Sequence, residues 1–245
     1  MIYDSVNIGH IEKCTTLTGI ETNLEETMAF VIDIDTKEKI LVPKIICVGR
    51  NYAAHAEEMG TEARSEPLLF FKPPTALLHQ GRSIPYPPFT SDLHHEVELG
   101  IVIGESGKDI KMEKSCVHIY GYLLALDLTL RDKQAEAKKE GAPWAICKGF
   151  DGSLPVSMVV RTNNLKAIQS MNIKLWINGQ LRQSANTNQM IFSIEELISY
   201  ISRFFTLERG DIIMTGTPEG VSPILPGDVI EAELGTRLRI TFSVR

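Results

Sequence analysis

Residues 94–104 read HHEVELGIVIG, an apolar run that two glutamates, Glu96 and Glu98, interrupt. Alternation of this kind is typical of a β-strand, in which residues i and i+2 project from the same face. The Cα atoms of the two glutamates are therefore expected about 6.6 Å apart. Repulsion between two charged, partly buried carboxylates at that spacing costs roughly 2.5 kcal/mol at an effective dielectric constant near 20. A solvated face, a raised pKa of one glutamate or a cation between the two would offset this repulsion.

Comparable strand-like segments continue along the chain from residue 44 to the C-terminus. They cover residues 45–49, 67–72, 119–128, 154–160, 173–177, 180–184, 211–216, 228–234 and 238–244. Asn178-Gly179 separates two of these segments and predicts a β-hairpin, because this dipeptide adopts the positive φ angles of a tight two-residue turn. Strands therefore dominate this part of the chain.

Helices are predicted in only three places, which are residues 51–60, 130–141 and 193–210. Ser193 and Glu196 form a capping box that opens the last of them, and Gly141 is a C-terminal cap for the second. Because strands do not alternate regularly with helices, a parallel doubly wound sheet is disfavoured. The pattern predicts an α+β fold built on a curved, mixed β-sheet.

The first 43 residues contain two further strand-like segments, 28–35 and 37–43, and Pro43 ends the second of them. We expect residues 1–43 to form a small N-terminal appendage and residues 44–245 to form the main domain. With 245 residues, the chain is long enough to bury a sizeable core.

The composition is that of an ordinary globular protein, with 43% hydrophobic and 23% charged residues and a net charge of -6. Nucleic acid is disfavoured as a partner, because its binding draws on clustered lysines and arginines and these are scattered here. Widely spaced cysteines favour reduced thiols over a zinc ribbon or a disulfide framework; they are Cys14, Cys47, Cys116 and Cys147. No segment approaches the roughly 18 apolar residues that span a bilayer, and the N-terminus lacks a signal-peptide pattern. We expect a cytoplasmic protein with no membrane partner.

A third acid, Asp127, ends the apolar run GYLLALD. A buried aspartate is expensive unless it is paired or bound to a metal. Glu96, Glu98 and Asp127 would together offer an all-oxygen ligand set, which suits Mg²⁺ or Mn²⁺. The alternative is a strand whose acidic face is solvated. His94 and His95 precede the glutamates, but a site made of hard oxygen ligands does not need them.

Three further features carry possible chemistry. His55 and Glu58 are three residues apart on an expected helix. A carboxylate that holds one imidazole nitrogen leaves the other free to take a proton from water, whereas a solvated surface pair is the alternative. Lys148 could place a positive charge against an anionic intermediate or could be a turn lysine. The loop at residues 215–218, Thr-Gly-Thr-Pro, could hold a carboxylate or could be a simple turn.

Seven motifs, taken in order, resemble those of the fumarylacetoacetate hydrolase family. They are CVGRNYAAHAEEM, PLLFFKP, HHEVELGIVIG, GYLLALDLTLRDKQ, PWAICKGFD, LWINGQLRQ and GDIIMTGTPEGV. The resemblance is closest to the short members that act as acylpyruvate hydrolases and oxaloacetate decarboxylases, and residues 1–43 fall outside its strongest part. It implies a mixed β-sheet roll with few helices, a homodimer, and a divalent cation that is generally Mg²⁺.

The resemblance also implies roles for individual residues of this chain. By motif position, the metal carboxylates are Glu96, Glu98 and Asp127, and a lid dyad consists of His55 and Glu58. The implied substrate-contacting residues are Arg131, Gln134 and Lys148 around the substrate oxygens, and Arg50, Tyr52 and Thr217 near the substrate carboxylate.

The function that this resemblance favours is Mg²⁺-dependent or Mn²⁺-dependent C-C bond hydrolysis of 2,4-diketo acids (acylpyruvates), which gives pyruvate and a carboxylic acid. In this hypothesis the keto acid chelates the metal, His55 deprotonates a water molecule while Glu58 orients it, and Lys148 with Gln134 stabilises the oxyanion. Oxaloacetate decarboxylation and keto-enol or double-bond isomerisation are alternatives, because they use the same electron sink. A non-enzymatic metal-binding or ligand-binding protein on the same fold is a further alternative, which the presence of both His55 and Glu58 disfavours.

Overall fold

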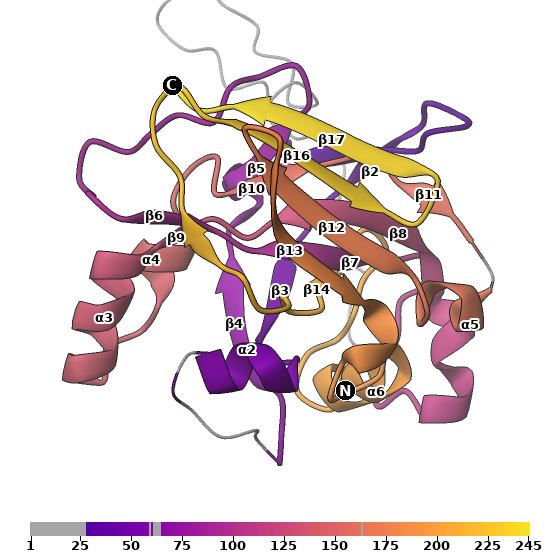
Figure 1. Ribbon diagram of the computed structural model, residues 1–245. Helices are drawn as coiled ribbons and strands as arrows, with labels where there is room; N and C mark the ends of the chain where they lie inside the picture. The colour runs from indigo at the N-terminus through magenta and orange to yellow at the C-terminus, as the bar shows by residue number, and fades with distance from the viewer. Residues whose placement is uncertain (1–27, 59, 61–64, 163) are drawn as a thin grey trace, which may run out of the picture.

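A large mixed sheet, against which a smaller antiparallel sheet packs, forms the centre of the protein (Figure 1). The computed structural model describes residues 28–58, 60, 65–162 and 164–245. Cys14, the N-terminal stretch without a signal-peptide pattern and residues 1–27 of the expected appendage lie outside these described residues. The mixed sheet and the small share of helix confirm the predicted α+β class and the curved sheet roll.

Eight strands form the large sheet within the described residues. Its central strands, β7 (Val97–Ile103) and β8 (Ile119–Leu126), pair antiparallel, so that Glu98 lies opposite Ala125. The other strands are β3 (Ile45–Gly49), β4 (Leu68–Lys72), β5 (Leu77–His79), β10 (Leu154–Val156), β11 (Val160–Arg161) and β14 (Ile212–Met214). β3 and β14 are parallel, as are β5 and β10, whereas the remaining neighbours run antiparallel.

The small sheet contains β12 (Asn172–Ile177), β13 (Gln180–Asn186), β16 (Val229–Leu234) and β17 (Leu238–Ser243). Asn178 and Gly179 join β12 to β13 with φ angles of 51° and 78°, which confirms the predicted hairpin. Its apolar face, which includes Leu175 and Phe242, packs on the face of the large sheet that carries Leu99.

The two central strands are buried on both faces. Leu99 and Ile101 of β7 face the core shared with the small sheet, whereas Val102 faces a second core. Because side chains alternate along a strand, Glu98 shares the face of Val102. That face is a core rather than a solvated surface, so the alternative interpretation of a wet acidic face is wrong.

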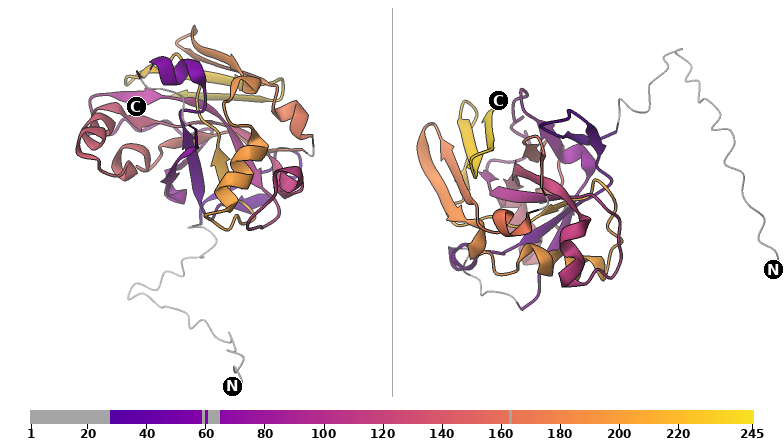
Figure 2. Two further views of the ribbon diagram at one scale, coloured as in Figure 1. Left: turned by 90° about the horizontal axis from the view of Figure 1, so that it is seen from below. Right: turned by 90° about the vertical axis from the view of Figure 1, so that its right-hand side faces the viewer.

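An N-terminal hairpin of β1 (Phe30–Ile32) and β2 (Lys39–Leu41) covers the second core. The right-hand view of Figure 2 shows this hairpin (indigo) and the small sheet (orange to yellow) on opposite sides of the large sheet. Asp33, directly after β1, accepts a hydrogen bond of 2.6 Å from the hydroxyl of Tyr120 in β8. The hairpin therefore shares its core with the main sheet, while the expected division at residue 43 stays a prediction.

The expected single strand at 94–104 is two strands. β6 (Leu93–His95) pairs with β9 (Thr129–Leu130) and β15 (Ser222–Pro223), whereas β7 belongs to the large sheet. The chain changes sheets at Glu96, whose carbonyl accepts a hydrogen bond of 2.8 Å from the N-H of Asp127. This crossing places both acids at the same end of the large sheet.

The predicted helices are present, with shifted ends. They are α2 (Ala53–Glu58), α3 (Arg131–Glu140) and α6 (Ile194–Ser202), and the short helices α4 (Ala145–Lys148) and α5 (Leu165–Ile168) accompany them. Short 3-10 turns occupy Pro74–Ala76, Met112–His118 and Thr187–Gln189. The capping box of α6 and the left-handed cap at Gly141 are formed as predicted. α6 ends at Ser202, earlier than expected, and Leu207 forms an isolated antiparallel bridge with Gly107.

Candidate active site

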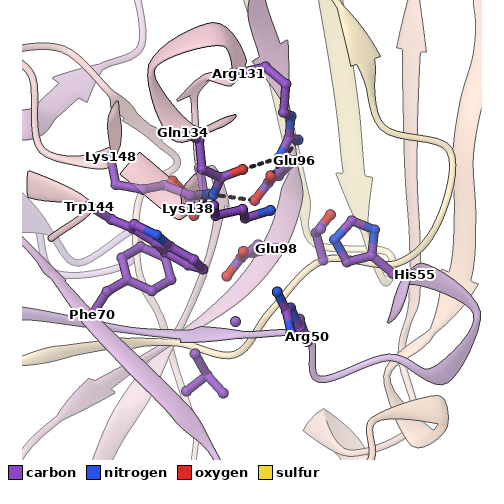
Figure 3. A pocket seen from close by; sticks show the side chains of 14 residues that line it. Arg50, His55, Phe70, Glu96, Glu98, Arg131, Gln134, Lys138, Trp144 and Lys148 are labelled. Carbon is purple, nitrogen blue, oxygen red and sulfur yellow. Dashed lines mark hydrogen bonds and ion pairs between the residues drawn. The ribbon is translucent and has the colours of Figure 1, made fainter. Parts of the chain in front are cut away.

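A pocket opens where the ends of β7 and β8 meet α2, α3 and α4 (Figure 3). The residues that line it are Val48, Gly49, Arg50, His55, Phe70, Glu96, Glu98, Asp127, Arg131, Gln134, Lys138, Trp144, Lys148 and Thr217. Nine of the eleven predicted site residues are among them, and the other two, Tyr52 and Glu58, are not. The structure thus brings the separate motifs to one place, while the role of each residue stays a prediction.

The floor of the pocket is a cluster of three buried carboxylates. One oxygen from each of Glu96, Glu98 and Asp127 lies within 4.8 Å of the others. Their exposed fractions are 5%, 2% and 0%, so solvent screens their mutual repulsion little. A cluster of this kind persists only where positive charges offset it.

Two of the three carboxylates are paired with lysine or arginine side chains. Glu96 accepts hydrogen bonds of 2.7 Å from both Lys148 and Arg131. Asp127 lies between Lys148, at 2.7 Å from Oδ2, and Lys72, at 2.8 Å from Oδ1. Burial alone would raise the pKa of Glu96, but the charges of Lys148 and Arg131 outweigh burial and lower it.

Glu98 is the exception in the cluster. It accepts a hydrogen bond of 2.8 Å from the backbone N-H of Gly216, and no lysine or arginine of the described residues forms an ion pair with it. Burial raises the pKa of Glu98 well above its usual range, and the charges of Asp127 and Glu96 raise it further. Glu98 is therefore the carboxylate of the cluster whose negative charge no side chain of the described residues neutralises, and a bound cation would neutralise it.

These observations fit a divalent cation. Three convergent carboxylate oxygens are a donor set that Mg²⁺ or Mn²⁺ prefers, and water or substrate would complete the coordination. Both ring nitrogens of His95 are occupied, by Gln183 and by Ser222, which removes this histidine from the ligand set. His94 contacts Asp92 instead.

The predicted dyad is formed at the rim of the pocket. Nδ1 of His55 lies 3.2 Å from Oε2 of Glu58, and His55 is buried rather than solvated. The Glu58 carboxylate also accepts hydrogen bonds of 3.1 and 3.2 Å from the backbone N-H of Gly220. This arrangement leaves Nε2 of His55 as the nitrogen that is able to exchange a proton with a bound molecule.

The remaining predicted residues surround the cluster. Arg131 donates a hydrogen bond of 2.7 Å to the side-chain oxygen of Gln134, and both come from α3. Arg50 has a φ angle of 61°, a left-handed conformation that is uncommon outside glycine, and Figure 3 shows its side chain at the pocket. Tyr52 is buried, and its hydroxyl has no hydrogen-bond partner among the described residues. Burial and the nearby Glu98 raise the pKa of this hydroxyl.

Gln183, in the motif LWINGQLRQ, is a residue that the sequence did not single out. It is buried in β13, and its side-chain oxygen accepts hydrogen bonds from the N-H of Val97 and from Nδ1 of His95. Its nitrogen donates to Thr217 Oγ1 and to the carbonyl of Pro218. Burial lowers the pKa of His95 to about 4, which keeps the imidazole neutral. Gln183 therefore fastens the strand between the two glutamates to the loop beside them.

Two lysines were also missed. Lys72, which is 1% exposed, donates to the carbonyl oxygens of Leu128, Lys148 and Ser153 as well as pairing with Asp127. A lysine inside the apolar run PLLFFK was a signal for a buried ion pair. Lys138 lies seven residues after Arg131 on α3, and this spacing was a signal that both lie on one helix face.

The sequence of the chain matches a known protein family. Residues 44–244 match the family of the fumarylacetoacetate (FAA) hydrolase C-terminal domain. The chain therefore belongs to the fumarylacetoacetate hydrolase family, as the resemblance of the seven motifs predicted.

Individual members of the family show which relatives this chain is similar to. The chain is 50% identical over 191 residues to "Oxaloacetate decarboxylase, mitochondrial" of Dictyostelium discoideum, covering 77% of this chain and 87% of the relative. It is 46% identical over 200 residues to "Oxaloacetate tautomerase FAHD1, mitochondrial" of Homo sapiens, covering 82% and 90%. Among solved structures, a fumarylpyruvate hydrolase from Pseudomonas aeruginosa in complex with Mn²⁺ and pyruvate superposes with a TM-score of 0.84. It is 36% identical, and the match covers 89% of this chain and 95% of that one.

Some expectations are not decided by these findings. None of the helices in the described residues is long and apolar enough to cross a membrane. The two curated relatives are named mitochondrial, so a cytoplasmic location for this chain stays a prediction. The homodimer implied by the resemblance likewise stays a prediction.

Proposed function

We propose that this protein is a divalent-metal-dependent enzyme that interconverts the enol and keto forms of oxaloacetate. The observation that carries the proposal is that one pocket holds both the carboxylate cluster and His55, whose partner Glu58 orients it from behind. The names of the relatives at 46% and 50% identity support oxaloacetate as the substrate.

The proposed chemistry divides between the cluster and the dyad. Glu96, Glu98 and Asp127 would hold Mg²⁺ or Mn²⁺, and the bound cation would supply Lewis acidity that makes the protons beside the keto group easier to remove. His55, with Nδ1 held by Glu58, takes a proton from C3 of the keto form through Nε2. The C2 oxygen then takes a proton from solvent, which gives the enol. In the reverse direction, the enol hydroxyl gives its proton to solvent and His55 returns a proton to C3. The reaction thus needs one base at one carbon, proton exchange at the C2 oxygen and no attack by water.

Other residues of the pocket bind and orient the substrate in this proposal. Arg131 and Gln134 face the substrate oxygens, and Lys148 adds a positive charge beside them. Arg50 and Thr217, which line the pocket, bind the C1 carboxylate of the substrate. Tyr52, whose buried hydroxyl has no hydrogen-bond partner among the described residues, supports the same subsite.

Two related reactions have their own support. Loss of the C4 carboxylate of oxaloacetate as CO₂ leaves its electron pair at C3, and a proton delivered there gives pyruvate. The name of the Dictyostelium discoideum relative favours this route. Similarity to the solved fumarylpyruvate hydrolase favours hydrolysis of an acylpyruvate. In that reaction His55 would take its proton from water instead of from carbon.

The test follows three signals in one experiment. Enol oxaloacetate is added to the protein with Mg²⁺ or Mn²⁺, and enol absorbance, pyruvate and CO₂ are measured in the same samples. We expect the enol absorbance to decay faster than in buffer without matching pyruvate, and EDTA to abolish the effect. His55→Ala should slow the exchange by about 10²- to 10⁴-fold while leaving metal affinity intact. His118→Ala, outside the pocket, is the matched control.

Each result that contradicts enol-keto exchange would support one of the alternative functions. Pyruvate and CO₂ formed at the rate of enol loss would assign decarboxylation. Rapid turnover of acetylpyruvate, with oxaloacetate untouched, would assign hydrolysis. Metal binding without turnover of any keto acid would leave the non-enzymatic binding protein.

A further inference from the structure

Lys138 lines the pocket but, unlike Arg131 and Lys148, forms no ion pair with the carboxylate cluster. It projects from α3 on the same face as Arg131 and Gln134 and lines the pocket with them (Figure 3). Its ammonium group lies 5.7 Å from the centre of the Trp144 ring, so the side chain lies close to that wall of the pocket. Because Lys138 is more exposed than Lys148, it lies toward the mouth rather than the floor.

Within the described part of the chain, Lys138 also has no acidic partner. Arg131 and Lys148 pair with the carboxylate cluster, and Lys133 of the same helix pairs with Glu136. Among the described residues, no carboxylate lies within ion-pair distance of Lys138. Partial burial and the charges of Arg50 and Arg131 lower the pKa of Lys138, which indicates a locally positive environment. A positive mouth above an acidic floor is suited to a ligand that is anionic at its far end.

Substrates of the proposed reaction differ at that far end. In a 2-keto acid, the C1 carboxylate and the C2 oxygen are the groups suited to the cluster and its cation. Oxaloacetate carries a second carboxylate, whereas acetylpyruvate and phenylpyruvate end in uncharged groups. A dicarboxylic substrate would supply the carboxylate that Lys138 does not find among the described residues, whereas a monocarboxylic one would not.

We propose that Lys138 binds the distal carboxylate of the substrate and makes the enzyme select dicarboxylic over monocarboxylic 2-keto acids. This inference rests on the proposed function, because it assigns the substrate class of the same site. The contact is at the pocket mouth, so it contributes to binding and selectivity rather than to proton transfer. Lys138 is therefore a specificity-determining residue, separate from the dyad and the cluster.

The test compares Lys138→Met with Lys138→Arg and with Lys139→Met, an exposed neighbour on the same helix. Lys138→Met should lower kcat/KM for oxaloacetate by about tenfold, mainly through KM, and should leave phenylpyruvate tautomerisation unchanged within about twofold. Lys138→Arg should retain most of the preference, and Lys139→Met all of it. Equal losses on both substrates, or the same loss in Lys139→Met, would overturn the inference.

A binding measurement separates this inference from the proposed reaction. Calorimetry in the presence of Mn²⁺ compares malate, a dicarboxylic 2-hydroxy acid, with lactate, its monocarboxylic counterpart. Wild type should bind malate at least about tenfold more tightly than lactate, and Lys138→Met should lose that preference while still binding lactate. A wild type that turns over no keto acid but shows this pattern would refute the reaction and retain the role of Lys138. Equal affinity of wild type for malate and lactate would refute the role itself.

Discussion

Lys72 and Asp127 form an ion pair of 2.8 Å in which neither side chain is exposed. Lys72 reaches Oδ1 of Asp127 from β4, whereas Lys148 reaches Oδ2, so the aspartate is held at both oxygens. The hydroxyl of Ser153 also lies 3.0 Å from the Lys72 ammonium. The orientation of a central pocket carboxylate is thus set by a lysine outside the pocket lining.

Removing this lysine should destabilise the protein strongly. Lys72→Met leaves Asp127 with one cation and removes a donor from the carbonyl oxygens of Leu128, Lys148 and Ser153. We therefore expect a loss of about 3–5 kcal/mol in the free energy of unfolding. Urea denaturation measures it, and Lys114→Met on the surface should change little. The double variant Lys72→Met, Asp127→Asn should recover part of the loss. A single variant as stable as wild type would show that the pair is not needed.

Glu98→Gln should act in opposite directions with and without metal. In EDTA near neutral pH the variant should melt at a higher temperature than wild type. Burial beside Asp127 and Glu96 raises the pKa of Glu98, so folding must either bury its charge or protonate it, and glutamine avoids that cost. With Mn²⁺ it should be less stabilised than wild type, because a ligand is lost. The loss of affinity should exceed the roughly 10- to 100-fold typical of residues that only orient a ligand. Calorimetric titration with Mn²⁺ measures it, and the exposed Glu105→Gln is the control. Unchanged Mn²⁺ affinity would exclude Glu98 from the ligand set.

Gln183→Leu should lower both the stability of the protein and its metal affinity, although Gln183 does not line the pocket. The substitution leaves the N-H of Val97, the carbonyl of Pro218 and the hydroxyl of Thr217 without one of their partners. We expect a loss of about 2–3 kcal/mol in stability and at least about tenfold in metal affinity. Gln180→Leu, at the exposed start of the same strand, should affect neither quantity. If stability falls and metal affinity does not, Gln183 serves the fold alone.

Asp33 should make the stability of the protein depend on pH in the acid range. Burial raises its pKa, but hydrogen bonds from Tyr120 and from the backbone of Thr36 and Asp35 outweigh burial and lower it. A depressed folded-state pKa stabilises the protein above the unfolded-state value, near 3.8, and this contribution is lost as the pH falls through the folded-state pKa.

The corresponding variant is Asp33→Asn. It should be less stable than wild type by about 1–2 kcal/mol at neutral pH, and the difference should shrink below about pH 4. Urea titrations at several pH values measure this, and the exposed Asp35→Asn is the control from the same turn. A difference that stays constant down to acid pH would contradict the assignment to charge.

Local signals in the sequence predicted local structure well. The Asn178-Gly179 turn, the capping box at Ser193 and the cap at Gly141 each depend on a few neighbouring residues, and each is formed. The carboxylate cluster was predicted from two segments, and the β7–β8 pairing brings their ends together. The family match over residues 44–244 agrees with the ordered motifs.

Contacts between distant segments were not predictable in the same way. The change of sheet at Glu96 depends on a backbone hydrogen bond from Asp127, which the alternation of side chains does not reveal. Gln183 looked like one more polar residue of a hairpin, because its four partners come from other parts of the chain. The sequence left Lys148 open as a lysine that faces an intermediate or as a turn lysine. Its pairing with Glu96 and Asp127 became visible only in three dimensions.

The hydrogen bond from Gly220 to Glu58 links the loop at residue 220 to the His55–Glu58 dyad. The donor is a backbone N-H, and Gly220 has a φ angle of 93° with no room for a Cβ, which would lie 2.1 Å from the carbonyl oxygen of Arg182. Any larger residue there must shift the loop and carry the donor away from Glu58. Glu58 contacts both His55 and the loop, so a displacement of the loop at Gly220 would also release the carboxylate that orients His55. The orientation of the proposed base therefore depends on the position of this loop.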